Sequence, residues 1–263
     1  MDAAQSASTY AHIRDKTMIK ALLNSFGFLS ILPVGMPSSL EDVAKHMYLF
    51  PIVGAVLGLG AGLTASFLQT GLPGPVAAVL GFFALLILTG FHHLDGLLDL
   101  GDALIYRGAS ERRHEILHDT STGVGGFGAG LFITLTSVFT TVEYIGAGGS
   151  AVLFFAASET LAKLAMVISA ALGQPAFEGT GSIFASELKK HWWQTPISIV
   201  ITAGILLALA GMTGLFLLAV PIVSALFFIA LSKRLLGGVS GDVFGAANEV
   251  TRLTVMLVML WML

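Results

Sequence analysis

The chain has 263 residues, of which 55% are hydrophobic and only 11% charged, with a net charge of −3 and no cysteine. Soluble domains average roughly 25% charged residues, so the composition excludes a soluble globular enzyme, a disordered tail and a nucleic-acid-binding protein. It predicts an all-α, polytopic integral membrane protein, because only lipid accommodates so much apolar surface.

In chain order, we expect a polar tail over residues 1–20 and a single membrane-embedded catalytic domain over 21–263. Residues 21–33 are apolar but too short to cross a bilayer, which predicts an interfacial or re-entrant helix. Seven apolar runs near the roughly 20 residues that a bilayer requires are then the expected transmembrane helices. They cover residues 48–68, 74–91, 125–145, 151–172, 195–210, 213–231 and 251–263.

Lysine and arginine are confined to alternate segments between these runs. With a cytoplasmic N-terminus, the positive-inside rule places residues 1–47, 92–124, 173–194 and 232–250 on the cytoplasmic side. These segments hold every Lys and Arg except Lys163 and Arg252. The sequence therefore predicts a multi-pass protein of the cell (plasma) membrane whose active site faces the cytoplasm.

Three aspartates after the second apolar run carry the strongest chemical signal. Asp95, Asp99 and Asp102 are spaced i, i+4, i+7, which places them on one helical face within about 60°. A divalent cation would relieve their mutual repulsion, and oxygen ligands suit Mg²⁺ or Mn²⁺. We expect these residues to be metal ligands; a solvated helix face is the alternative, disfavoured because the chain has only 16 acidic residues.

Two histidines, His92 and His93, directly precede these aspartates where the apolar run ends. An imidazole at this position is a candidate metal ligand, general base or phosphate-binding group. The alternative is a histidine that is simply hydrogen-bonded at the membrane interface.

A second motif joins basic residues to a turn rich in Ser, Thr and Gly that leads into the next apolar run. Backbone N–H groups at a helix N-terminus bind anions, and basic side chains add charge-assisted contacts to phosphate. We therefore expect a catalytic role for Asp119. The expected substrate-binding residues here are Arg112, Arg113, His118, Gly123 and Gly125. Helix packing is the alternative role for the glycines.

A third cluster precedes the last apolar run. Asp242 and Glu249 are spaced i, i+7 on one helical face, with the small Gly245 between them and Asn248 beside them. We expect Asp242, Asn248 and Glu249 to bind substrate and to join the three aspartates in one site. A polar helix cap is the alternative.

Glu159 and Lys163 lie i, i+4 inside the fourth apolar run, where they would most simply neutralise each other in a structural pair. The residues alone therefore indicate a cytoplasm-facing, carboxylate-rich membrane site with anion-binding glycines. Such a site suits metal-assisted phosphoryl or nucleotidyl transfer.

The run HLDGLLDLGD at residues 93–102 resembles the H-L-D-G-x-x-D-x-x-D signature of the cobalamin synthase (adenosylcobinamide-GDP ribazoletransferase) family. Further elements agree in order, from LPV at 32–34 and PIVG at 51–54 to GDVFGAANE at 241–249. The family usually carries a Lys before and an Arg soon after the position of Asp119, where this chain has His118 and residues 120–122 (TST). Arg112, Arg113 or His118 would then supply the basic contacts.

The resemblance implies the joining step that completes cobalamin assembly. A hydroxyl of α-ribazole, or of its 5′-phosphate, would attack the cobinamide-side phosphorus of adenosylcobinamide-GDP, and GMP would leave. It implies Mg²⁺ as the cofactor, with a carboxylate or His93 as the base. The implied partners are the corrinoid nucleotide, the ribazole and membrane lipid, with a homo-oligomer or other corrinoid-assembly enzymes left open.

Two other functions fit the residues less well. A CDP-alcohol phosphatidyltransferase would carry an Arg at a fixed distance after its first Asp-Gly pair, and no Arg follows Asp95 and Gly96 at that distance. A cation transporter would place acidic residues in the middle of several spans, whereas only Glu159 lies so deep.

Overall fold

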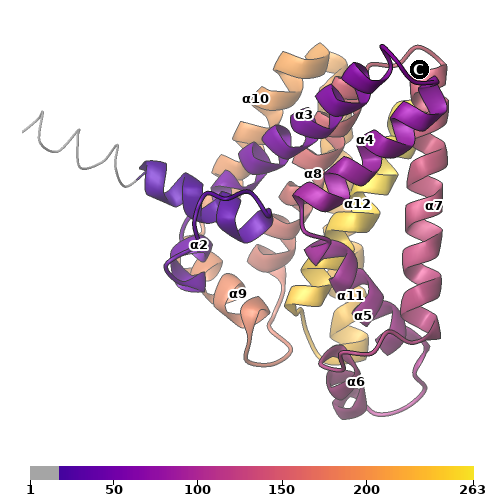
Figure 1. Ribbon diagram of the computed structural model, residues 1–263. Coiled ribbons are helices and arrows are strands. Elements are labelled where there is room, and N and C mark those ends of the chain that lie inside the picture. The colour runs from indigo at the N-terminus through magenta and orange to yellow at the C-terminus, as the bar shows by residue number, and fades with distance from the viewer. Residues whose placement is uncertain (1–17) are drawn as a thin grey trace, which may run out of the picture.

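The computed structural model describes residues 18–263, which form a bundle of helices (Figure 1). Within this range, β-type pairing is limited to one isolated bridge between Pro175 and Val239. The predicted all-α membrane fold is confirmed, while residues 1–17 of the predicted tail lie outside the described residues. The helices are Met18–Leu29, α2 (Leu40–Ala44), η1 (Met47–Leu49), α3 (Phe50–Leu68), α4 (Gly74–Leu88), α5 (His92–Ile105), α6 (Ser110–Leu117), α7 (Val124–Gly146), α8 (Ala151–Leu172), α9 (Thr180–Lys190), α10 (Gln194–Gly214), η2 (Leu215–Leu218), α11 (Ala219–Leu236) and α12 (Gly241–Trp261).

Five helices in the described part of the chain are long and apolar enough to cross a membrane, and the bent pair α4–α5 makes a sixth if it is one broken crossing. The predicted number of seven is one more than these six, because it treats one of the five long stretches as two separate crossings. This stretch, Gln194–Leu236, has 43 residues, and its backbone breaks at Gly211 with φ of 65°. At about 1.5 Å per residue it is roughly twice as long as the bilayer core is thick, so it contains enough chain for two crossings.

The break between α4 and α5 bends the chain by 87°. The predicted span 74–91 therefore ends early, at Leu88. Gly90 and Phe91 both adopt left-handed backbone angles, with φ of 61° and 60°. Glycine accepts this conformation freely, whereas a bulky residue does so at a cost. The turn points α5, with its three aspartates, away from the direction of α4.

The centre of the bundle is α8, which packs closely against α3 (Figure 1). A stripe of glycines makes this approach possible. A Cβ atom on Gly54, Gly58 or Gly62 would lie 2.3 to 2.6 Å from backbone atoms of α8. Without a hydrophobic driving force between helices in lipid, such small residues let backbones gain dispersion contacts at short range.

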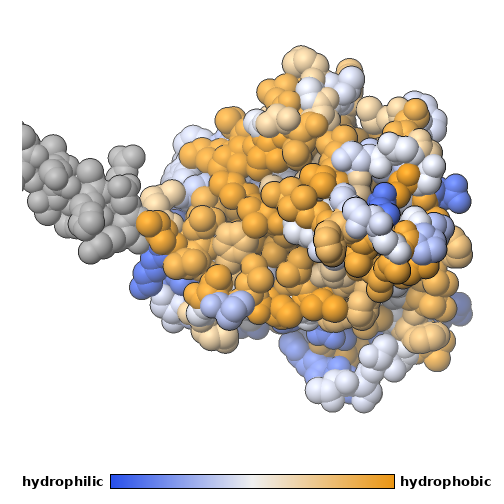
Figure 2. Space-filling model, turned by 45° about the horizontal axis from the view of Figure 1, so that its top comes forward, coloured by the Kyte–Doolittle hydropathy of each residue, from blue (hydrophilic) through white to orange (hydrophobic). Residues whose placement is uncertain are grey.

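The outer face of the bundle is apolar, as a membrane protein requires. Hydrophobic side chains cover most of the surface in Figure 2. Among them, Phe132 and Phe139 on α7 are each 66% exposed, and Val200 on α10 is 70% exposed. Exposed apolar area of this extent is compatible with lipid as the surrounding solvent.

The last helix differs from its prediction, because α12 begins at Gly241 and not near residue 251. Residues 241–250 were expected in a cytoplasmic segment on account of their polar side chains. In the structure Asn248, Glu249 and Arg252 are buried inside the bundle, where they bond to one another and to α8. Polar residues that are paired inside a bundle do not mark the end of a membrane helix.

Candidate active site

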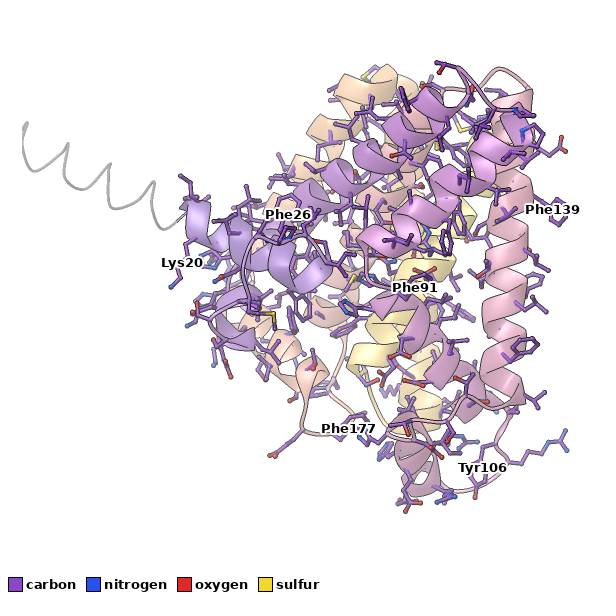
Figure 3. All side chains as sticks on the ribbon, viewed as in Figure 1. Lys20, Phe26, Phe91, Tyr106, Phe139 and Phe177 are labelled. Atoms are coloured by element: carbon purple, nitrogen blue, oxygen red, sulfur yellow. The ribbon has the colours of Figure 1, made fainter. Side chains whose placement is uncertain are left out.

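The three aspartates predicted as metal ligands project from α5, which runs from beside Phe91 to beside Tyr106 (Figure 3). Asp95 is exposed, and Asp99 and Asp102 are partly buried. Over residues 18–263, none of the three forms a salt bridge with a basic side chain. Asp99 interacts electrostatically with the other two and with a fourth carboxylate, Asp242.

Asp242 reaches this cluster because α5 and α12 lie in backbone contact. A Cβ atom on Gly96 would lie 2.9 Å from Asp242 Cα, and one on Gly245 would lie 2.9 Å from the His93 carbonyl oxygen. Ser240 donates a hydrogen bond of 3.1 Å to the Asp242 carboxylate and caps α12. The structure thus brings together two motifs that are about 150 residues apart in the sequence.

Asp102 has a further role that the sequence did not indicate. Its carboxylate accepts hydrogen bonds from the backbone N–H groups of Gly123, at 2.7 Å, and Gly126, at 2.9 Å. These donors lie at the N-terminus of α7, so the carboxylate fills the anion position expected for a substrate phosphate. Gly125 is a packing glycine, because a Cβ atom there would lie 2.5 Å from the Gly101 carbonyl oxygen.

The donor set of this cluster suits a hard cation only in part. The oxygen ligands match Mg²⁺, yet within the described residues no group of three His, Asp or Glu side chains is arranged to hold a metal alone. Mg²⁺ is usually held by one or two carboxylates, with water and substrate phosphates completing its shell. The geometry therefore fits a cation shared with a phosphorylated substrate.

The basic residues of the second motif mostly bond to the protein itself. Arg113 donates to the carbonyl oxygens of Ala103, Tyr106 and Gly108, and so holds the chain where α5 ends. Arg112 forms an exposed pair with Glu115.

The other two polar residues that were expected in the site, His118 and Asp119, are exposed. His118 packs edge-on against Phe177, with ring centroids 5.2 Å apart, and interacts electrostatically with Asp242. Asp119 accepts a 3.0 Å hydrogen bond from the Ser121 backbone N–H, which lowers the pKa of the Asp119 carboxyl below its usual value. Asp119 is therefore an anion at neutral pH.

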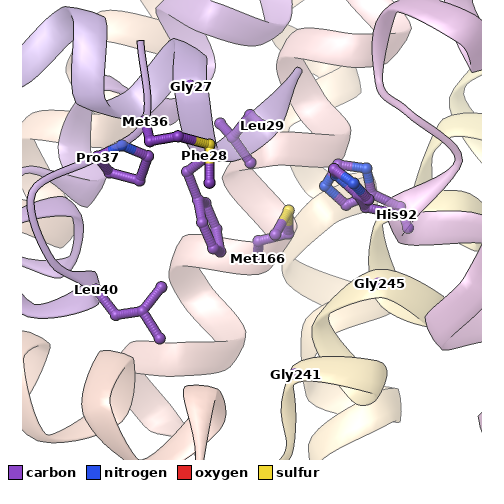
Figure 4. A pocket seen from close by; sticks show the side chains of 11 residues that line it. Gly27, Phe28, Leu29, Met36, Pro37, Leu40, His92, Met166, Gly241 and Gly245 are labelled. Carbon is purple, nitrogen blue, oxygen red and sulfur yellow. The ribbon is translucent and has the colours of Figure 1, made fainter. Parts of the chain in front are cut away.

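Two cavities lie at the two ends of α5. The cavity at its C-terminal end has a volume of about 560 Å³ and is lined by Asp102, Arg107, Asp119 and the turn 121–124. The cavity at its N-terminal end has a volume of about 400 Å³ and is lined by His92, His93 and mainly apolar side chains (Figure 4). The aspartates of α5 lie between them.

Asn248 and Glu249 belong to a different cluster, a buried charge network between α8 and α12. Lys163 bonds to Glu159 and, at 2.8 Å, to the Asn248 side-chain oxygen. Arg252 bonds to Glu249 and, at 3.4 Å, to Glu159. All five side chains are buried. The expected Glu159–Lys163 pair is present, and residues of α12 extend it into a larger network. The i, i+3 spacing of Glu249 and Arg252 was the sequence signal that could have predicted the ion pair on α12.

Comparison with known proteins places this chain in a family. Residues 21–260 match the family described as cobalamin-5-phosphate synthase. The chain belongs to this family. Cobalamin-5-phosphate synthase is the family that the 93–102 signature indicated, so that resemblance is confirmed.

Among its relatives are proteins named adenosylcobinamide-GDP ribazoletransferase. The one from Methanocella arvoryzae is 35% identical over 93% of this chain and 98% of its own length. Those from Methanosarcina mazei and Klebsiella pneumoniae are 34% and 30% identical, over 90% and 92% of this chain and 90% and 100% of their own lengths. No solved structure matches this cobalamin-5-phosphate synthase family member.

Proposed function

We propose that this chain is an adenosylcobinamide-GDP ribazoletransferase that joins adenosylcobinamide-GDP to α-ribazole, or to its 5′-phosphate, in the last assembly step of cobalamin biosynthesis. Its membership of the family and the names of its relatives support the reaction. The observation that carries the proposal is the group of four carboxylates, Asp95, Asp99, Asp102 and Asp242, without a basic ion-pair partner in the described chain. A substrate diphosphate can share a cation with such a group.

In the reaction, a ribazole hydroxyl oxygen forms a bond to the cobinamide-side phosphorus. The bond from that phosphorus to the oxygen bridging to GMP breaks, and the hydroxyl proton passes to a base on the protein. We assign the base to His93, because this imidazole lines the cavity beside the carboxylates and its Nδ1 has no hydrogen-bond partner within residues 18–263.

We further propose that the reaction depends on Mg²⁺. One or two of Asp95, Asp99 and Asp242 would hold it together with substrate phosphates, because Asp102 is already engaged at the N-terminus of α7. The cation would neutralise charge on the diphosphate and on the phosphate of the departing GMP. Asp102 then holds α5 in place relative to α7, and Asp119 and Arg107 line the cavity that we assign to the nucleotide.

We also propose that the protein lies in the plasma membrane with this site on the cytoplasmic side. The distribution of Lys and Arg supports that orientation, because α6 and the ends of α9 and α11 carry basic residues on the side of the carboxylates. The loop between α3 and α4 at the other end of the bundle carries none.

The experiment is a GMP-release assay with the purified protein, adenosylcobinamide-GDP and α-ribazole, with and without Mg²⁺. We expect turnover that chelation abolishes and that Mg²⁺ restores. Asp95→Asn and Asp99→Asn should each lower turnover on the order of a hundredfold or more, because each removes a charge that stabilises the transition state. Asp42→Asn is the matched control, since Asp42 pairs with Lys45 on the surface of α2.

No GMP release by the wild-type protein would refute the proposed reaction. Release that is unaffected by chelation would refute the metal assignment alone. A cation transporter would instead show ion flux in liposomes without any release of GMP.

A further inference from the structure

Resting on the proposed function, we propose that the cavity at the N-terminal end of α5 binds the benzimidazole base of α-ribazole. Three parts of the chain build its wall. They are the helix Met18–Leu29 with Phe28 and Leu29, the following segment with Met36, Pro37 and Leu40, and α8 with Met166 (Figure 4). Apolar side chains predominate, and no Lys or Arg is found among the described residues that line it.

The cavity also has a polar end. His92 and His93 line it, and Figure 4 shows His92 facing the space between α5 and α8. His93 is only 5% exposed, and its Nδ1 is buried without a hydrogen-bond partner inside the described chain. A buried polar atom without a partner is costly, and a bound hydroxyl or ring nitrogen is the kind of group that removes this cost.

The polar end adjoins the carboxylates. Gly241 and Gly245 of α12 line the cavity and flank Asp242 in the sequence, and Gly245 touches the backbone of His93. Asp95 is one helical turn beyond His92 on α5. A molecule with its flat apolar part among Phe28 and Met166 would therefore present its sugar to His93 and to the carboxylates.

Of the two substrates, only α-ribazole has this form. It is a riboside of 5,6-dimethylbenzimidazole, a small uncharged base with apolar edges, and a cavity of about 400 Å³ is in the usual range for such ligands. Adenosylcobinamide-GDP carries a charged diphosphate, which the apolar wall does not pair. It also carries a corrin macrocycle, which that wall does not enclose. The cavity at the other end of α5, with Arg107 and the hydroxyl side chains of Ser121 and Thr122, is better suited to phosphates.

The test measures KM for each substrate separately by GMP release. Phe28→Ala and Met166→Ala should each raise KM for α-ribazole about tenfold or more, and leave KM for adenosylcobinamide-GDP within about twofold of the wild type, since each removes a large part of the apolar wall. Phe139→Ala is the matched control, because Phe139 lies on the outer face of α7 (Figure 3). The rings of Phe28 and Phe184 stack with their centroids 5.2 Å apart, so removing the Phe28 ring also removes a packing contact. Thermal unfolding and the more conservative variant Phe28→Leu therefore distinguish a folding defect from a binding defect.

A second readout does not depend on turnover. Calorimetric titration with α-ribazole should show binding to the wild type and to Phe139→Ala, and weaker binding to Phe28→Ala. The riboside without the two methyl groups should bind the wild type roughly fourfold more weakly per methyl group, and Phe28→Ala should reduce that difference. The assignment would be overturned if Phe28→Ala raised the KM for adenosylcobinamide-GDP alone. It would also be overturned if Phe28→Ala left ribazole binding unchanged and instead displaced a lipid from the cavity. Ribazole binding without GMP release would overturn the proposed reaction and leave the cavity assignment intact.

Discussion

Replacing Gly96 by alanine tests whether the contact between α5 and α12 assembles the carboxylate cluster. The new Cβ atom would lie 2.9 Å from Asp242 Cα and 3.0 Å from the Asp242 carbonyl oxygen, whereas ordinary contacts begin at 3.4 Å. Both neighbours are backbone atoms, so no side-chain rotation relieves the overlap. The helices must separate by about 0.5 to 1 Å at this point to restore ordinary contacts.

That separation moves Asp242 away from Asp95 and Asp99. Misplacing a reacting group by about 1 Å can lower the rate on the order of a hundredfold, while overpacking costs about 1–3 kcal/mol of stability. We therefore expect Gly96→Ala to remain folded but to lose on the order of a hundredfold in kcat. Gly245→Ala should behave alike, because its Cβ atom would lie 2.9 Å from the His93 carbonyl oxygen.

The assay is GMP release together with thermal unfolding in the same detergent. Gly128→Ala on α7 is the control, because no atom outside its own helix backbone and chain neighbours lies within 4 Å of its new Cβ atom. Alanine there should keep full activity and should stabilise the helix by up to about 1 kcal/mol. Wild-type kcat in Gly96→Ala would show that the position of Asp242 relative to α5 does not matter, and the shared-site argument would fail.

Three further predictions follow from the bundle. Arg252→Met should lower the free energy of unfolding by about 3–5 kcal/mol, because it leaves Glu249 buried without its cation, and adding Glu249→Gln should recover part of that loss. Asp102→Ala should cost about 1–2 kcal/mol in thermal unfolding through the lost cap on α7, a loss that a control Asp42→Ala would not show. The chain has no cysteine, so a single introduced cysteine reports its own position. Gly71→Cys should react with an impermeant reagent in intact cells, and Ser110→Cys only after permeabilisation; the reverse pattern would invert the topology.

Much of the site could be predicted because its signals are local. The i, i+4, i+7 spacing of Asp95, Asp99 and Asp102 depends only on helix geometry, and α5 is a helix. The apolar runs likewise depend on the thickness of a bilayer. The grouping of Asp242 with α5 was also expected, and the glycine pair Gly96 and Gly245 supplies its physical reason.

What the sequence did not indicate depends on contacts between distant segments. No local pattern predicts that Asp102 caps a helix that begins 22 residues later, or that Asn248 on α12 bonds to Lys163 on α8. The cavity beside His93 is completed by Phe28, about 65 residues earlier in the chain. Such partners follow from how the helices pack, and a single sequence does not report that packing.

The buried charge network also bears on how the protein enters the membrane. Glu159 and Lys163 lie i, i+4 on α8, and Glu249 and Arg252 lie i, i+3 on α12, so each of these four buried charges has an opposite charge on its own helix. The remaining charge on α12, Asp242, lies in its first turn. The buried charges of either helix are therefore already paired when the helix leaves the translocon, before the other helix is in place. The bonds from Arg252 to Glu159 and from Lys163 to Asn248 form only when the two helices meet. Insertion of each helix is thereby independent of assembly of the bundle. Neither helix has an unpaired charge in lipid, whichever of the two is inserted first.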